Sequence, residues 1–133
     1  MGKHWILAGT LLALLSVPAA GIAQDEEEPV CVTTDKELNR VYKKVRATYK
    51  DEPLFLAKLK VAQRAWIKFR DGHLDSRYPL DPQAYGTASV NCWCLENAEL
   101  TAARTKQLKK WLKGTMEGDD CYGSYKFYHQ LKK

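Results

Sequence analysis

Hydrophobic residues recur with the period of an α-helix in three segments of the chain. The first segment carries apolar side chains three or four positions apart: Leu38, Val41, Tyr42, Val45 and Tyr49. This spacing places side chains on one helical face. Thr34 and Glu37 have the spacing of a capping box, in which two side chains satisfy free backbone amides at a helix start. The pattern predicts a helix over about residues 35–50.

The second segment begins after Asp51 and Glu52, with Pro53 suited to the first turn of a helix. Its apolar residues form one face: Phe55, Leu56, Leu59, Ala62, Ala65, Trp66 and Phe69. Gly72 is the expected end, so the predicted helix covers about residues 53–71. The short link to the preceding helix predicts an antiparallel hairpin.

The third segment has Asn91 as its expected cap and Gly114 as its expected stop, which predicts a helix over about residues 91–113. Its inner stripe consists of Cys94, Ala98, Thr101, Thr105, Leu108 and Leu112, flanked by Leu95, Ala102 and Trp111. This stripe is expected to face the core.

Two stretches lack a helical period. Residues 73–90 contain Pro79, Pro82 and Gly86, which predicts a long loop of the kind that often carries function. The aromatic residues after Gly114 are expected to form a short helix or to pack irregularly. No strand pattern is present, so the predicted fold class is all-α. The expected architecture is a small disulfide-linked bundle of three main helices, with an aromatic C-terminal tail.

The N-terminus has the layout of a secretory signal peptide. Lys3 and His4 precede an almost unbroken apolar run over residues 6–17, and small residues follow up to Ala23. We expect cleavage after Ala23, with Ala20 as a second candidate. An uncleaved anchor is the alternative, but the run is shorter than the roughly 20 residues of a spanning helix. The expected location is the periplasm or the extracellular space.

Cleavage there leaves an acidic flexible leader over residues 24–32 and a domain over residues 33–133. The domain divides into a core over residues 33–113 and a tail over residues 114–133. Cys31 does not directly follow the cleavage site, so a lipoprotein is not expected.

The four cysteines are Cys31, Cys92, Cys94 and Cys121. Disulfides persist in an oxidising compartment. A bond between Cys92 and Cys94 would close a tiny, strained ring, so each end cysteine is expected to pair with one of the middle two. The two remaining pairings stay open. Each bridge would contribute about 2–4 kcal/mol. Zinc-type ligand spacing is absent, and we expect neither a metal nor another cofactor.

Composition narrows the class of protein. The chain has 133 residues, of which 28% are charged and 11% aromatic, values that exclude a disordered or collagen-like chain. The formal net charge is +5, or +4 once Lys3 is removed with the signal peptide. The basic residues are expected to form a solvated outer face. Nucleic acid is not an expected partner for two reasons. The aromatic residues lie on the apolar stripes rather than among the lysines, and an exported protein does not meet cellular nucleic acid.

Motifs that carry catalytic chemistry are missing. The chain has no nucleophile elbow, phosphate loop, zinc-protease motif or dinucleotide fingerprint. Acid pairs such as Asp71 and Asp75 are common on surfaces and do not by themselves indicate a hydrolase. We therefore expect a protein that is not an enzyme.

Several residues together form a recognisable pattern. Residues 59–71 read Leu-Lys-Val-Ala-Gln-Arg-Ala-Trp-Ile-Lys-Phe-Arg-Asp, and include Gln63, Arg64, Trp66, Arg70 and Asp71. The run closely resembles the core motif of the LprI-type lysozyme-inhibitor domain family. Supporting landmarks are Asp35, Leu38, Asn39 and Tyr42 upstream, and Gly86, Thr87, Leu100, Thr101, Arg104 and Leu108 downstream.

The resemblance covers about residues 33–112 and implies a small, exported, cysteine-linked helical domain. It also implies inhibition of host-type lysozyme, which protects bacterial peptidoglycan. Members of the family commonly carry a cysteine shortly after the Arg-Asp of the motif, whereas Leu74 or its neighbour stands there in this chain. Cys121 is a candidate substitute partner.

The resemblance and the loop together suggest which residues matter. We interpret Gln63, Arg70, Asp71 and Arg104 as polar contacts within the scaffold. The candidate contacts to lysozyme lie in or near the loop: His73, Asp75, Arg77, Tyr78, Asp81 and Tyr85. Host-type lysozymes are basic, so recognition would depend on local acids, or on a basic side chain that reaches the catalytic carboxylates.

Two alternatives to lysozyme inhibition remain. One is an envelope binding or stress module that contacts anionic cell-wall polymer, a lipid surface or another envelope protein. The other is an immunity-type protein that neutralises a rival's cell-wall enzyme.

Overall fold

The computed structural model describes residues 27–86 and 88–132. The predicted signal peptide and the start of the leader lie outside these residues. The elements in chain order are α1 (Val30–Thr48), α2 (Pro53–Arg77), the 3-10 turn η1 (Pro82–Tyr85), α3 (Ala88–Lys113) and α4 (Tyr128–Leu131). The described residues include no strand, only an isolated bridge between Thr115 and Phe127. The predicted all-α class with three main helices is confirmed. No helix in this part of the chain is both long and apolar enough to cross a membrane.

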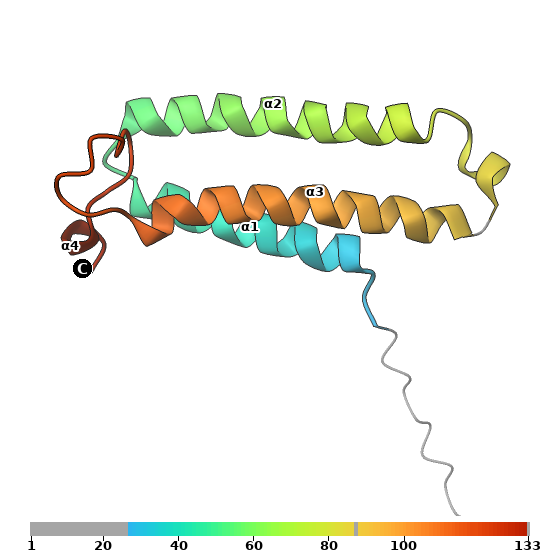
Figure 1. Cartoon of the computed structure of the whole chain (residues 1–133), viewed down its shortest axis with the longest axis horizontal. Helices are drawn as coiled ribbons and strands as arrows, with labels where there is room; N and C mark the ends of the chain where they lie inside the picture. The colour runs from blue at the N-terminus through green and yellow to red at the C-terminus, as the bar shows by residue number, and fades with distance from the viewer. Residues whose placement is uncertain (1–26, 87, 133) are drawn as a thin grey trace, which may run out of the picture.

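The three long helices lie side by side and form a rod (Figure 1). α1 and α3 run parallel and pack closely, while α2 runs antiparallel to both and makes fewer close backbone contacts. The connection between α2 and α3 forms one end of the rod, and the C-terminal tail lies at the other end (Figure 1).

The core forms around the apolar face of α1. Leu38, Val41 and Val45 are buried against Leu59 of α2 and Leu108 of α3. Tyr49 is also fully buried, and its hydroxyl donates to the carbonyl of Trp111 and accepts from the amide of Lys126. Burial raises the pKa of this hydroxyl. The predicted stripe of the first helix is therefore confirmed.

The start of α1 differs from the prediction. The helix begins at Val30, so the last three residues of the predicted leader are helical. Thr34 lies inside the helix, and its hydroxyl donates to the carbonyls of Val30 and Cys31. The predicted capping box is wrong, because these carbonyls already belong to the helix and Glu37 pairs with basic side chains.

The end of α2 also differs. Pro53 occupies the first turn as predicted, but Gly72 does not end the helix, which continues to Arg77. Leu74 is 2% exposed, and its burial stabilises the additional turns. Pro79 then prevents continuation, because the residue before a proline is disfavoured in a helix. The predicted loop between the second and third helices is therefore present, but it lies between Arg77 and Ala88 and is shorter than the expected residues 73–90.

α2 buries part of the expected face, since Phe55, Leu56 and Trp66 pack against the core. Leu59 and Gln63 are buried, whereas Phe69 is 59% exposed. The hydrophobic pattern therefore locates part of the inner face, but it misses the polar Gln63 and includes the exposed Phe69.

α3 matches its predicted inner stripe. Ala98, Thr101, Thr105 and Leu108 are buried, and the helix ends before Gly114 as expected. Beyond Gly114 the tail folds back, and the side chain of Lys126 donates to the carbonyl of Thr48 at the end of α1. The tail thus contains both a short helix and irregular, ordered segments.

Candidate functional site

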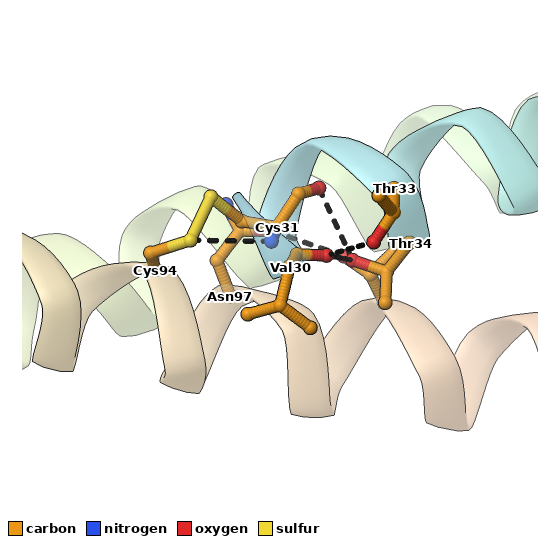
Figure 2. The surroundings of a disulfide bond; sticks show 7 residues. Val30, Cys31, Thr33, Thr34, Cys94 and Asn97 are labelled. Atoms are coloured by element: carbon orange, nitrogen blue, oxygen red, sulfur yellow. Dashed lines mark hydrogen bonds between the residues drawn. A yellow bond between two sulfur atoms is a disulfide. The ribbon is translucent and has the colours of Figure 1, made fainter. Parts of the chain in front are cut away.

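A disulfide joins Cys31 in the first turn of α1 to Cys94 in α3 (Figure 2). The amide of Cys31 also donates to the Cys94 sulfur at 3.1 Å. This is one of the two pairings that the sequence left open. Cys92 and Cys121 are free and exposed. The expected second bridge is wrong, because Cys92 lies near the start of α3 and Cys121 follows its end.

Arg70 links α1 to α2. Its guanidinium donates to Asp35 of α1 at 3.0 Å and pairs with Asp71 at 3.0 Å. It also lies 5.2 Å from the centre of the Trp66 ring, within the range of a cation–π contact. The structure thus brings together four residues that the resemblance singled out.

Gln63 and Arg104 link α2 to α3. The Arg104 Nε donates to the Gln63 Oε1 at 3.0 Å, and the same guanidinium donates to Gln107. Burial lowers the pKa of Arg104. Desolvation is thus offset by two hydrogen bonds that hold the side chain in one orientation.

Glu96 of α3 pairs with two of the residues that are predicted to contact lysozyme. Its carboxylate lies 3.0 Å from the Nε2 of His73 and 2.9 Å from an Arg77 nitrogen. Both residues belong to the unpredicted last turns of α2. They fasten α2 to α3 beside the end of the rod.

A pocket of about 410 Å³ lies at this end and is called the tip pocket. It is lined by Asp75, Tyr78, Leu80, Tyr85, Ser89, Val90 and Trp93. The rings of Tyr78 and Tyr85 meet edge to face at 5.8 Å, and the Tyr85 hydroxyl accepts from the amide of Leu80. Asp81 instead caps η1 by accepting from the Gln83 amide. Three of the six predicted contacts, Asp75, Tyr78 and Tyr85, therefore line one pocket. The other three lie elsewhere: His73 and Arg77 pair with Glu96, and Asp81 caps η1.

A second hollow, between α1 and α2, has a volume of about 310 Å³ and is called the basic groove. It is lined by Asn39, Tyr42 and Arg46 from α1 and by Lys60, Gln63, Arg64 and Ile67 from α2. All of these residues except Arg46 belong to the pattern that carries the family resemblance. The sequence analysis did not predict this groove. The sequence feature that could have revealed the groove is a second, polar stripe at helical spacing on each of the two helices.

The remaining motif residues have other places. Leu38 belongs to the core. Gly86 has a φ of 76° where the chain leaves η1, a conformation that glycine adopts readily. Thr87 lies outside the described residues. Within the part of the chain that the structure describes, no group of histidine, cysteine and acidic residues could hold a metal ion.

Comparison with known proteins gives one family. The sequence model of the lysozyme inhibitor LprI family matches residues 31–108, which include α1 except its first residue, all of α2 and most of α3. No curated protein and no solved structure matches the chain. The name of the family describes inhibition rather than catalysis, and the disulfide fits an extracellular location. The match covers more than half of the chain, so the protein belongs to the lysozyme inhibitor LprI family.

Proposed function

We propose that this protein is an exported, non-enzymatic inhibitor that occludes a host-type lysozyme, and that the tip pocket makes the contact. The observation that carries this placement is an exposed apolar pocket at the end of the rod, inside the region that the family match covers. Occlusion of the lysozyme cleft would protect peptidoglycan without any chemical step.

The tip pocket has the composition of a protein contact. Leu80, Val90 and Trp93 are exposed there, with Val90 at 60% and Trp93 at 40%. Apolar side chains gathered in one exposed place mark interaction sites, and tryptophan contributes heavily to binding free energy when a partner covers it. The pocket therefore offers an anchor that a partner protein can bury.

Shape and charge support contact at short range. α1 begins short of this end, so α2, α3 and the connection between them form the tip of the rod (Figure 1). The net charge of +5 gives no long-range attraction to a basic lysozyme. Asp75, which lines the tip pocket, supplies a local negative charge for basic residues at the cleft.

The test measures lysozyme lysis of bacterial cells in the presence of the purified protein. We expect saturable inhibition that follows one-to-one binding. Unchanged lysis at a large molar excess would contradict the proposed function.

Matched variants test the tip pocket separately. Val90→Ser removes an apolar contact at the tip, whereas Val61→Ser makes the same change on α2, where Val61 is 66% exposed. Asp75→Asn removes the tip carboxylate, with Asp120→Asn as its control. We expect Val90→Ser and Asp75→Asn to weaken inhibition about tenfold each, and the controls to leave it unchanged. Equal inhibition by all four variants would place the contact elsewhere.

A further inference from the structure

The basic groove concentrates positive charge that nothing on its lining neutralises. Arg46, Lys60 and Arg64 line it, and no acidic residue does. Among the described residues none of these three forms an ion pair, and Arg46 only lies over the Tyr42 ring at 5.9 Å. By contrast, Arg40, Arg70 and Arg77 each face a carboxylate.

The two helices present these side chains as facing stripes. Asn39, Tyr42 and Arg46 are three and four positions apart on α1, as are Lys60, Gln63 and Ile67 on α2. Residues at this spacing share a helical face. The groove is thus formed by regular elements, whose side chains are held more precisely than those of a loop.

Gln63 adds a neutral donor that is already oriented. The side chain is 8% exposed, and its Oε1 accepts from Arg104, which can only donate. The amide oxygen therefore faces Arg104, which leaves the Nε2 amino group on the other side. None of the described residues accepts from Nε2, and no fully buried side-chain nitrogen lacks a partner. The amino group is therefore accessible to solvent, and the residue that carries it lines the groove.

This set of donors matches one class of ligand. A phosphate ester carries roughly −1.5 to −2 charges and several acceptor oxygens. As a ligand for three cationic side chains it is therefore a better match than a carboxylate, which carries a single charge. Guanidinium groups bind phosphate through two parallel hydrogen bonds, and lysine acts as a point charge. The volume of about 310 Å³ is at the lower end of the range of small-ligand sites.

We propose that the basic groove binds a phosphate ester, with Arg46, Lys60 and Arg64 as the cationic contacts and the Gln63 amino group as a neutral donor. The site is separate from the tip pocket and does not depend on lysozyme inhibition. The phosphate is carried either by a soluble sugar phosphate or by the headgroup of an anionic lipid.

Calorimetric titration of the purified protein with glucose 6-phosphate and with inorganic phosphate tests the soluble source. We expect saturable binding that weakens as salt is added. The double variant Lys60→Gln/Arg64→Gln should bind about tenfold more weakly or worse, because two charge-assisted hydrogen bonds are lost. The control Lys44→Gln/Lys68→Gln removes the same amount of charge from the two helices that form the groove, at positions outside it. It should change the affinity less than twofold.

Gln63→Glu tests the oriented amide. The substitution keeps an acceptor for Arg104 and replaces the amino group with an oxygen that repels phosphate. We expect loss of binding with an unchanged circular dichroism spectrum. Should this variant unfold, the exposed Lys60 and Arg64 still provide the decisive comparison.

Sedimentation with vesicles distinguishes the two sources. Retention on phosphatidylglycerol but not on phosphatidylcholine vesicles, lost in Lys60→Gln/Arg64→Gln, supports a lipid headgroup in the groove. Saturable binding of the soluble esters with the same loss supports a soluble ligand. Equal binding by the groove and control variants, binding of acetate without phosphate, or no binding of any probe would overturn the proposal.

Discussion

Glu37 shows how single contacts link helices in this protein. Its carboxylate accepts from Arg40 one turn ahead at 2.7 Å and pairs with Lys109 of α3 at 2.8 Å. The Arg40 hydrogen bond, followed by that of Lys109, lowers the pKa of Glu37 from 4.5 to about 2. Because the side chain faces water, solvent screens the pair and its contribution to stability is small.

The lowered pKa fixes the sign of a pH effect. The stabilising contribution of Glu37 is complete above pH 4.5 and is lost as the pH falls through about 2. Glu37→Gln should therefore lower the thermal midpoint modestly above pH 4.5, and this difference should shrink toward pH 2. Thermal denaturation across this range measures it, with the exposed Glu99→Gln as the control. A difference in thermal midpoint that stays constant with pH would contradict the lowered pKa of Glu37.

At the scale of elements, two glycines that look alike in the sequence have opposite roles. Gly72 lies inside α2, and a Cβ there would meet nothing within 4 Å. Gly114 ends α3 with a φ of 73°, and a Cβ there would lie 2.6 Å from the Leu131 Cδ1 and 2.7 Å from the Lys126 carbonyl oxygen. The first glycine only weakens a helix, whereas the second lets the tail pack against the helix end.

The same substitution at both positions should change stability in opposite directions. Gly72→Ala should raise the free energy of unfolding by about 0.5–1 kcal/mol, because alanine favours a helix interior. Gly114→Ala should lower it by at least about 1–2 kcal/mol, because a left-handed conformation is costly with a Cβ. Urea denaturation measures both. Destabilisation by Gly72→Ala would mean that α2 does not continue past Gly72.

For the whole molecule, the Cys31–Cys94 bond constrains how the helices assemble. Its two cysteines are separated by 63 positions in the sequence, and the segment between them includes all of α2. Loop closure of this length restricts the unfolded chain more than the folded one. The bond also joins α1 to α3 near the end opposite the C-terminal tail, so the parallel pair is held at both ends (Figure 1).

Replacement of cysteine pairs should separate the structural bond from the free thiols. Cys31→Ser/Cys94→Ser should lower the free energy of unfolding by about 2–4 kcal/mol. Cys92→Ser/Cys121→Ser should change it by less than about 0.5 kcal/mol, as exposed substitutions usually do. Urea denaturation, with titration of reactive thiols in the folded protein, measures both. A comparable loss in the second variant would indicate a bond between Cys92 and Cys121.

The sequence alone determined the class of fold and the faces of two helices. The apolar series through Leu38, Val41 and Val45, and the stripe from Ala98 to Leu108, appear in the structure as buried faces. These are local patterns with the period of the helix, so they need no knowledge of distant residues. The residues of the family motif were also visible, because they are adjacent in the sequence.

Only the tertiary structure decided the end of α2, the disulfide pair and the convergence of the basic groove. Past Gly72, Leu74 is buried, and His73 and Arg77 pair with Glu96 of α3, which stabilises the last turns of α2. The position of Asn39 and Tyr42 across from Gln63 and Arg64 depends on how two helices pack. The physical reason is the same in each case: these contacts join residues that are far apart in the chain. Their free energy exceeds a weak local preference such as that of one glycine.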